Sequence, residues 1–453
     1  MLSKARHAGQ TTLSADRRGS QERGATLGLC WLFPATDGPV TPLLGPRVVL
    51  GRGEDCGTVL PGAEISRYHA EIFRNGPLAV LRDLGSRNGS FINGQPIREA
   101  PVGPGDVVRL GEWVGVVMAD VGEGSAQRWG TIVPGLYGGS RLRQAVSPAV
   151  RAAKSDLPII IQGETGTGKE VVARAIHAES GRRGSFLALN CAALPVGLAE
   201  GELFGYRRGA FTGADRSHRG HFRAAHGGTL LLDEVCELAL PLQAKILRVI
   251  EQREVLSLGE SQPVQIDTRI LAAAQGSLQQ AVADNTFRAD LLARLDGITI
   301  QLPPLRERIE DVPYLFARLL HEGSGGHPPG VDPLLVERLC LYDWPLNVRE
   351  LAALVRRLLV LYGHERSLKL DCLPERIRSW RPGETPAEPR DQNERDEAEF
   401  VRLIEALRGH AGNVSRAAAA LGISRQRAYR LIQARPEVDI ATFRGGKTSE
   451  DAG

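Results

Sequence analysis

The chain has 453 residues, which gives room for about three domains of ordinary size, each with a core of its own. Its formal net charge is only +3, so a charged partner must meet a local patch rather than the charge of the whole chain. The six cysteines form no CxxC pair and no metal-ligand spacing, and no signal-peptide core or run of 18 apolar residues occurs. We therefore expect a cytoplasmic multidomain protein with reduced thiols and no membrane segment.

Residues 1–24 are polar and arginine-rich without apolar periodicity, which predicts a disordered tail. From 25 to 120 the pattern changes to short β-favouring runs separated by glycine, proline and asparagine turns. These runs begin at Arg47, His69, Leu78, Ser90, Asp106 and Gly115. Regularly spaced short strands of this kind favour a β-sandwich.

Four polar patches fall in the predicted loops of this sandwich: Gly51-Arg52, Ser66 to His69 (SRYH), 85–89 (GSRNG) and 91–94 (FING). In this order they resemble the forkhead-associated (FHA) domain, whose loops bind phosphothreonine peptides. The resemblance implies peptide contacts from Arg52, Ser66, Arg67, Ser86 and Asn88. Arg52, Ser66 and Arg67 would meet the phosphate, Asn88 would hold the peptide backbone, and His69 would brace the loop. Guanidinium and hydroxyl donors suit a phosphate, although the same residues are also good turn formers.

Residues 121–134 are rich in glycine and small polar residues, as in a linker. From 135 to 305, helical patterns alternate with apolar strand candidates, which predicts a parallel sheet covered by helices on both faces. These candidates begin at Leu157, Phe186, Thr229, Thr268 and Ile298. A ligand of such a sheet binds at the carboxyl ends of the strands.

A glycine-rich turn, GETGTGKE at 163–170, follows the first of these strands and precedes a helix. Its backbone N–H groups and the helix N-terminus can cradle phosphates, and Lys169 can reach the outer phosphates of a nucleotide. The general pattern places Ser or Thr after the lysine to hold Mg²⁺, whereas this chain has Glu170. The residues expected to bind the nucleotide are Gly163, Glu164, Thr165, Gly166, Thr167, Gly168, Lys169 and Glu170.

The third strand candidate ends in two adjacent carboxylates, Asp233 and Glu234. Delivering charges at the end of an apolar strand is costly unless they have partners. One can hold Mg²⁺, directly or through water, and the other can polarise an attacking water. Capping of the following helix is the alternative, and the phosphate cradle upstream makes it the weaker one.

The sequence GAFTGA at 209–214 lies within LFGYRRGAFTGA, a combination of glycines, alanines, one threonine and one phenylalanine that suits a mobile docking loop. Together with LNCAAL, GGTLLLDE, FRADLLARL, LPPLRER and WPLNVREL, it resembles the AAA+ activators of sigma-54 RNA polymerase over about residues 136–380. This family typically carries glutamate after the lysine of its phosphate-binding loop (P-loop), so Glu170 agrees with it. The resemblance implies sigma-54 contacts from Gly209, Ala210, Phe211, Thr212, Gly213 and Ala214, above all from Phe211 and Thr212.

The same resemblance implies ATP and Mg²⁺ as cofactors and assigns roles to further residues. Asp233 would organise Mg²⁺, and Glu234 would activate water with Asn190 as its switch partner. Arg288 and Arg294 match arginine fingers, which reach into the neighbouring subunit and so require a ring such as a hexamer. Arg349 matches the second sensor, on a helical lid at 306–380.

Two positions depart from the family pattern. Ala274-Gln275 stands where the family usually has Thr followed by Asn or His, and Leu346 replaces the glycine of WPGN. Both departures could slow hydrolysis or alter its coupling. We still predict activity, because the cradle, the two carboxylates and both finger arginines remain.

Residues 381–392 are proline-rich and charged, which predicts a second linker. In 393–436, Asn413 and Ser424 can cap two helices that Gly422 separates, as in a helix-turn-helix, and a tail follows at 437–453. The segment resembles the Fis-type DNA-binding domain. The residues expected to contact DNA are Arg425, Gln426, Arg427, Tyr429 and Arg430, in a dimer on a palindromic enhancer site.

We therefore expect an all-β FHA sandwich, an α/β AAA+ P-loop ATPase core with an α-helical lid, and a small all-α helix-turn-helix domain. The implied function is ATP-dependent activation of sigma-54 RNA polymerase from enhancer DNA, controlled by a phosphothreonine protein or its kinase. The alternative is a phosphopeptide-responsive, DNA-bound scaffold or repressor with a weakened ATPase. An AAA+ chaperone or protease subunit is disfavoured by GAFTGA and by the helix-turn-helix.

Overall fold

The computed structural model describes residues 27–381 except positions 36, 37, 44, 46, 77, 120–128, 196 and 212–213, together with scattered positions between 400 and 431. The chain divides into two compact units, 1–379 and 380–453, which are described separately. Within the described ranges, no helix combines the length and the apolar character that a membrane crossing requires.

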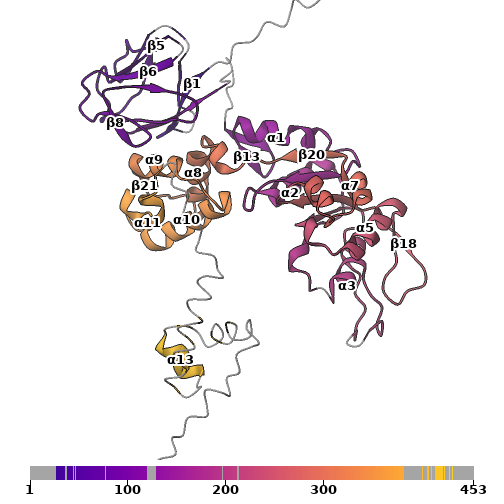
Figure 1. The fold of residues 1–453 in the computed structure, drawn as a ribbon. Coiled ribbons are helices and arrows are strands. Elements are labelled where there is room, and N and C mark those ends of the chain that lie inside the picture. Colours follow the sequence, from indigo (N-terminus) through magenta and orange to yellow (C-terminus); the bar gives the residue numbers. More distant parts are fainter. Residues whose placement is uncertain are drawn as a thin grey trace, which may run out of the picture. The chain divides into compact units, whose positions relative to one another are not determined.

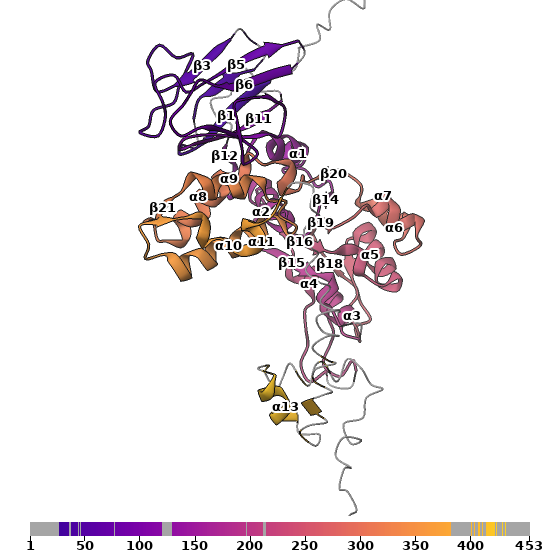
Figure 2. The ribbon, with the colours of Figure 1, turned by 60° about the vertical axis from the view of Figure 1, so that its left-hand side comes forward.

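Two sheets pack face to face to form the N-terminal sandwich (Figures 1 and 2). The first has the order β2-β1-β11-β10-β7-β8, with β1 (Gly28–Phe33), β2 (Val40–Pro42), β7 (Ser90–Ile92), β8 (Gln95–Ile97), β10 (Val107–Leu110) and β11 (Trp113–Met118). The second has the order β4-β3-β5-β6-β9, with β3 (Val48–Gly51), β4 (Thr58–Val59), β5 (Ala70–Asn75), β6 (Leu78–Asp83) and β9 (Glu99–Val102). Trp31 and Trp113 meet edge to face in the core between the sheets, with ring centroids 6.3 Å apart. The predicted sandwich is confirmed.

Strand β1 was not among the strands predicted from the sequence. Its residues GLCWLF form one apolar run in which both faces are buried, so the alternation that marks a half-exposed strand is missing. It pairs with β11 from Gly28 opposite Met118 to Phe33 opposite Val114.

The middle of the first unit is a five-stranded sheet in which every strand pair is parallel. Its order is β15-β16-β19-β14-β20, with β14 (Ile159–Gln162), β15 (Phe186–Asn190), β16 (Thr229–Asp233), β19 (Arg269–Ala274) and β20 (Ile298–Gln301). The connecting helices are α1 (Ser140–Arg151), α2 (Lys169–Ser180), α3 (Ala199–Phe204), α4 (His221–Ala224), α5 (Leu240–Gln252), α6 (Leu278–Ala283) and α7 (Ala289–Leu295). Short hairpins are formed by β12 (Gly130–Val133) with β13 (Leu136–Gly138) and by β17 (Glu254–Val255) with β18 (Val264–Gln265).

Helices cover both faces of this sheet, as the near-continuous apolar strands predict (Figure 2). Ile160 packs in one core with Ile246 of α5, whereas the neighbouring Ile159 packs in a second core with Val146 of α1 and Val172 of α2. Adjacent residues of one strand therefore belong to different cores, and the α/β fold class is confirmed.

The lid follows the last core strand and is helical. It consists of α8 (Asp311–Gly323), α9 (Pro333–Leu341), α10 (Asn347–Tyr362) and α11 (Glu375–Arg378), with a two-residue pairing of β21 (Gly330–Val331) and β22 (Ser367–Leu368). Asp332 caps α9 by accepting a hydrogen bond from the Leu334 backbone at 2.8 Å. Trp344 is fully buried and donates to the Leu339 carbonyl at 2.9 Å, so the end of α9 is joined to the segment that leads into α10.

In the second unit, α13 (Val414–Ala420) contributes to a small apolar core. This core contains Phe400, Leu403, Leu407, Val414, Ala417, Ala418, Ala428 and Leu431. The five residues predicted to contact DNA, Arg425, Gln426, Arg427, Tyr429 and Arg430, lie outside the described residues.

Glu310, just before α8, gives the first unit a predictable dependence on pH. Burial raises the pKa of this carboxyl from 4.5 to about 7, with the charge of Asp311 as a second cause. The folded state thus retains a proton that the unfolded chain loses, so stability falls as pH rises from about 4.5 to 7. Glu310→Gln, which is neutral at every pH, should remove a destabilisation of up to about 3 kcal/mol.

Thermal unfolding of the wild type and Glu310→Gln at pH 5 and pH 8 measures this effect. We expect the variant to unfold a few degrees higher at pH 8 and at nearly the same temperature at pH 5. An equal difference at both pH values would mean that ionisation of Glu310 is not the cause.

Candidate functional site

The glycine-rich turn between β14 and α2 forms a backbone cradle at the carboxyl end of the sheet. Gly163, Gly166 and Gly168 have positive φ angles of 153°, 78° and 105°, and α2 starts directly afterwards at Lys169. Gly166 also has no room for a side chain, because an added Cβ would lie 2.1 Å from the Leu346 carbonyl oxygen. The predicted strand, turn and helix start are therefore present, and the turn is closed from one side by the lid.

Lys169 lies inside this cradle and is only 7% exposed. Its Nζ donates to the carbonyl of Gly163 at 2.8 Å and, more weakly, to that of Glu164 at 3.4 Å. The Thr167 hydroxyl donates to the same Glu164 carbonyl at 2.8 Å. The ammonium is thus held at the loop that would surround a phosphate.

The P-loop, the two carboxylates and the lid meet in one cleft of about 280 Å³. It is lined by Thr165, Gly166, Gly168, Lys169, Glu170, Val171, Asp233, Glu234, Val348, Arg349 and Ala352. The cleft therefore brings together residues from three separate segments of the sequence, and each segment was predicted to contribute to the nucleotide site.

Asp233 ends β16, and its Oδ1 accepts a hydrogen bond from the Glu234 backbone at 3.0 Å. Glu234 has a positive φ of 54°, which is uncommon for a residue with a side chain and which the sequence did not predict. Carboxylate oxygens are the ligands that Mg²⁺ takes in proteins. Among the described residues, no three His, Cys, Asp or Glu side chains group as a metal site.

Two other predicted residues have local partners. Asn190 lies beside Asp233 in the parallel register, but its side-chain oxygen accepts from the backbones of Ala192 and Ala193 at 2.9 and 3.3 Å. It thus caps the short turn after β15 rather than bonding to Glu234. Glu170 is exposed and pairs with Arg174 one helical turn later at 2.7 Å.

The lid holds the P-loop through several polar contacts. Arg306 donates two hydrogen bonds, of 2.8 and 2.5 Å, to the carboxylate of Glu164 and thereby lowers the pKa of that carboxyl. Asn347 donates to the Thr165 carbonyl at 3.0 Å and to Glu164 at 3.2 Å. The backbone N–H of Arg349 donates to the Gly166 carbonyl at 3.3 Å.

Sequence reasoning missed Arg306 and Asn347, although both lie in motifs that were used for the family resemblance. The departure at Leu346 is explained by its φ of −105°, which any residue can adopt. The left-handed conformation falls instead on Asn347, with φ 52°. At the second departure, Ala274 is buried and its carbonyl accepts from Gly163 at 3.2 Å, whereas Gln275 is exposed.

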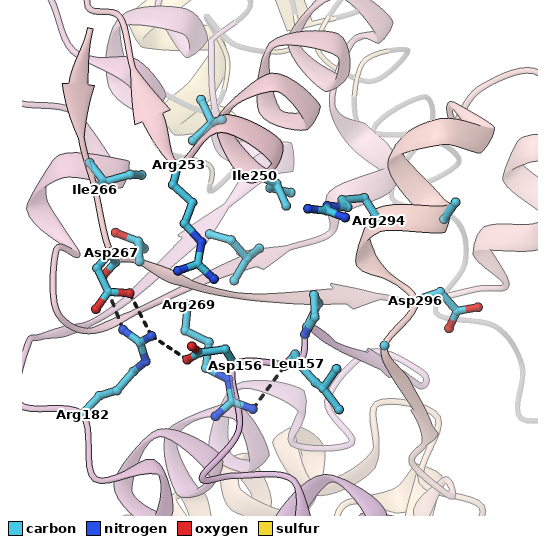
Figure 3. A pocket seen from close by; sticks show the side chains of 16 residues that line it. Asp156, Leu157, Arg182, Ile250, Arg253, Ile266, Asp267, Arg269, Arg294 and Asp296 are labelled. Carbon is cyan, nitrogen blue, oxygen red and sulfur yellow. Dashed lines mark hydrogen bonds and ion pairs between the residues drawn. The ribbon is translucent and has the colours of Figure 1, made fainter.

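The two predicted finger arginines do not line the P-loop cleft of their own chain. Arg288 is held by two hydrogen bonds to Asp290, of 3.0 and 2.7 Å. Arg294, on α7, lines a second cleft of about 300 Å³ near Ile250, Arg253 and Asp296 (Figure 3).

The GAFTGA loop is described at four of its six positions, since Thr212 and Gly213 lie outside the described residues. Its ends are joined by a hydrogen bond from Gly209 to the Ala214 carbonyl at 2.9 Å. Phe211 is 39% exposed and meets the ring of Tyr206 at 5.0 Å between centroids. An aromatic side chain is thus presented on the surface of the core.

The predicted phosphopeptide residues lie in the loops β3–β4, β4–β5 and β6–β7. Arg52, Arg67 and Asn88 are exposed. The Ser66 hydroxyl accepts from the Arg87 backbone at 3.1 Å, and Asn88 donates to the Glu64 carbonyl at 2.8 Å. The Ser86 hydroxyl donates to Asp83 at 2.6 Å, so its proton is already used within its own loop.

The buried side chain of His69 connects two of these loops by hydrogen bonds. Its Nδ1 accepts from the Ser66 backbone at 3.1 Å, so Nε2 carries the proton and donates to the Gly89 carbonyl, also at 3.1 Å. Burial lowers the pKa of this imidazole, which keeps it neutral.

Comparison with known proteins places these segments in families. The chain matches the models of the FHA domain over 48–111, the sigma-54 interaction domain over 137–301, the AAA+ ATPase lid domain over 306–390 and the Fis family of bacterial regulatory proteins over 394–430.

Three similar proteins illustrate the likeness. Regulatory protein AtoC of Escherichia coli (strain K12) is 40% identical over 309 residues, which is 66% of each protein. The DNA-binding transcriptional regulator NtrC of Azospirillum brasilense is 41% identical over 273 residues, 60% of this chain and 56% of NtrC. The structure of NtrX from Brucella abortus in complex with ATP is 32% identical, with a TM-score of 0.49, over 68% of this chain and 69% of NtrX.

The chain thus spans about two thirds or less of the length of AtoC and NtrC. The four family models follow one another in the order FHA, sigma-54 interaction, lid and Fis. By this order and the likeness to AtoC and NtrC, the chain belongs to the family of sigma-54-dependent transcriptional regulators, with an N-terminal FHA domain.

Proposed function

We propose that this protein hydrolyses ATP in a ring of identical subunits and uses the energy to remodel sigma-54 RNA polymerase from an enhancer site on DNA. Recognition of a phosphothreonine protein by the FHA domain would control this activity. The observation that carries the proposal is the cleft in which Lys169, Asp233, Glu234 and Arg349 converge.

The chemistry follows from the groups that line this cleft. The N–H groups of the P-loop and the start of α2 would hold the phosphates, and Lys169 would exchange its carbonyl partners for phosphate oxygens. Asp233 would bind Mg²⁺, which neutralises charge on the phosphates. Glu234 would orient and deprotonate the attacking water, while Arg349 would sense the nucleotide from the lid.

A ring is proposed because the two arginines that match the fingers do not line the P-loop cleft of their own chain. Arg294 lines a cleft that contains no P-loop residue, and Arg288 does not line the P-loop cleft either. In the proposed ring, such as a hexamer, a second subunit would bring these cations to the transferred phosphate. In related phosphoryl-transfer systems such a finger contributes about 10³ to 10⁵ in rate.

The departure at Leu346 gives little support to a scaffold with a weakened ATPase. Its backbone conformation needs no glycine, and the lid still reaches the P-loop through Asn347 and Arg349. The exposed Phe211 is a suitable anchor for sigma-54, since aromatic side chains are common hot spots of protein interfaces.

The first prediction separates the two acidic residues near the P-loop lysine. Asp233→Ala should lower kcat for ATP hydrolysis by about 100-fold or more, because it removes a metal ligand. Glu170→Ala should change kcat by less than about threefold, because Glu170 is exposed and pairs with Arg174. Steady-state ATPase assays at a concentration that forms rings measure both, and the reverse order of damage would contradict the assignment.

The second prediction concerns the FHA loops. Titration calorimetry should show binding of phosphothreonine peptides from a degenerate library and none of their unphosphorylated forms. Arg52→Ala should weaken this binding by about tenfold to 100-fold, because a charge-assisted hydrogen bond is lost.

Arg74→Ala is the matched control, since Arg74 is an exposed arginine of β5 outside these loops. It should leave the affinity within about twofold. Equal binding of phosphorylated and unphosphorylated peptides would refute phosphothreonine recognition.

The third prediction tests coupling to the polymerase. The wild type with ATP should convert closed complexes of sigma-54 RNA polymerase into open complexes, and Thr212→Ala should abolish the conversion. ATP hydrolysis should continue in the variant, because the adjacent Phe211 does not line the P-loop cleft. Permanganate footprinting of the promoter together with an ATPase assay distinguishes loss of coupling from loss of hydrolysis. Open complexes at the wild-type level with Thr212→Ala would refute the role of the loop.

A further inference from the structure

The six-stranded sheet of the FHA sandwich is apolar on its outer face as well as on its inner face. Leu29, Trp31 and Val108 point into the sandwich, whereas their neighbours on the same strands form a separate buried cluster. The sandwich part of this cluster consists of Cys30, Leu32, Val107, Val114, Val116 and Met118, on β1, β10 and β11. A sandwich sheet that faces water would carry polar residues at these positions, so this face is built to be covered.

Helix α9 of the lid covers this face. Val336 and Cys340, one helical turn apart, belong to the same buried cluster as the six sandwich residues, while Leu335 and Leu339 are buried as well. A helix buried on both sides is consistent with a position between the lid and the sandwich. Trp129, just before β12, and Ile309, two residues before α8, also pack against the cluster.

A buried ion pair lies at this contact. Arg109 of β10 donates from Nε to Oε2 of Glu337 on α9 at 2.8 Å, and the two residues are 8% and 4% exposed. The Arg109 guanidinium also lies over the ring of Phe91 at 3.7 Å, and Phe91 pairs with Arg109 across β7 and β10. A buried arginine is costly unless its charge has a partner. Glu337 of the lid supplies this partner for Arg109.

The other end of α9 is connected to the P-loop by a series of hydrogen bonds. Trp344 donates to the Leu339 carbonyl, Asn347 donates its backbone N–H to the Trp344 carbonyl at 2.7 Å, and the Asn347 side chain reaches Thr165 at 3.0 Å. In many enzymes, the opening of a lid limits the release of product. A sandwich bound to both α9 and the segment around Trp129 opposes that movement.

We propose that the outer face of the FHA sheet is a docking surface for helix α9 of the lid in the same chain, and that this docking slows release of nucleotide from the P-loop cleft. The inference rests on the proposed nucleotide site, but the docking itself does not. The phosphopeptide loops stay accessible, because Arg52, Arg67 and Asn88 are exposed while α9 is in place. Asn88 lies three residues before Phe91, so a bound peptide would act on the strand that supports Arg109.

The test uses the full chain with a charge exchange across the interface. Arg109→Glu and Glu337→Arg each leave two like charges facing one another, whereas the double variant restores an opposite pair. Arg74→Glu is the matched control, since it makes the same charge change at an exposed position of β5. Hydrogen exchange of residues 333–341 reports docking, and stopped-flow release of N-methylanthraniloyl-ADP into excess ADP reports the hold on nucleotide.

We expect each single variant to speed exchange in 333–341 and to raise the release rate by about fivefold or more. The double variant and Arg74→Glu should stay within about twofold of the wild type. Exchange in β5 and β6 should not change in any variant, which separates undocking from unfolding of the sandwich.

Unchanged exchange in 333–341, or a double variant no better than the single ones, would overturn the docking. Faster exchange with an unchanged release rate would refute only the proposal that docking slows the release of nucleotide. If the wild type does not bind the labelled ADP, the proposed nucleotide site and the hold on it both fail, while hydrogen exchange still decides the docking.

Discussion

The close approach of the lid to the P-loop is the contact on which the candidate site depends. The carbonyl of Leu346 occupies the space that a side chain at position 166 would need, and Asn347, fully buried, donates to the P-loop and accepts from the Leu305 backbone at the end of the core. Arg306 adds a bidentate pair with Glu164. The shape of the phosphate cradle therefore depends on residues 142 to 182 positions further along the chain.

The strand order of the parallel sheet determines the distance between the P-loop and Asp233. β14 delivers the P-loop and β16 delivers Asp233, and β19 lies between them. Strands in a sheet are about 4.8 Å apart, so two ends separated by one strand are about 10 Å apart. That gap leaves room for phosphate groups and a hydrated metal ion between the cradle and the carboxylates. β19 carries small side chains, Ala272, Ala273 and Ala274, along the strand that borders this gap, and all three are buried.

Local patterns in the sequence predict the parts of this structure that depend on one segment. Strand and helix alternation predicts the covered parallel sheet, and GETGTGKE predicts the strand, turn and helix start. Contacts between distant segments leave no such pattern, which is why the pairing of Arg306 with Glu164 was missed. The conformation of Glu234 was missed for a different reason, because a single left-handed residue has no sequence signature unless it is glycine or asparagine.

Contacts between domains are equally hard to predict from sequence, as the outer face of the FHA sheet shows. A continuous apolar run such as β1 indicates burial on both sides but does not identify the covering element. The apolar residues of α9 and the sheet give the proposed contact its free energy, and they alone would allow the helix to slide. The Arg109–Glu337 pair contributes less net stability than apolar residues of similar size could, yet a shifted helix would leave both charges buried without partners. The pair therefore fixes the register of α9 on the sandwich. With a fixed register, a movement of the FHA domain would also move α9, and the lid would pass this movement on to the P-loop.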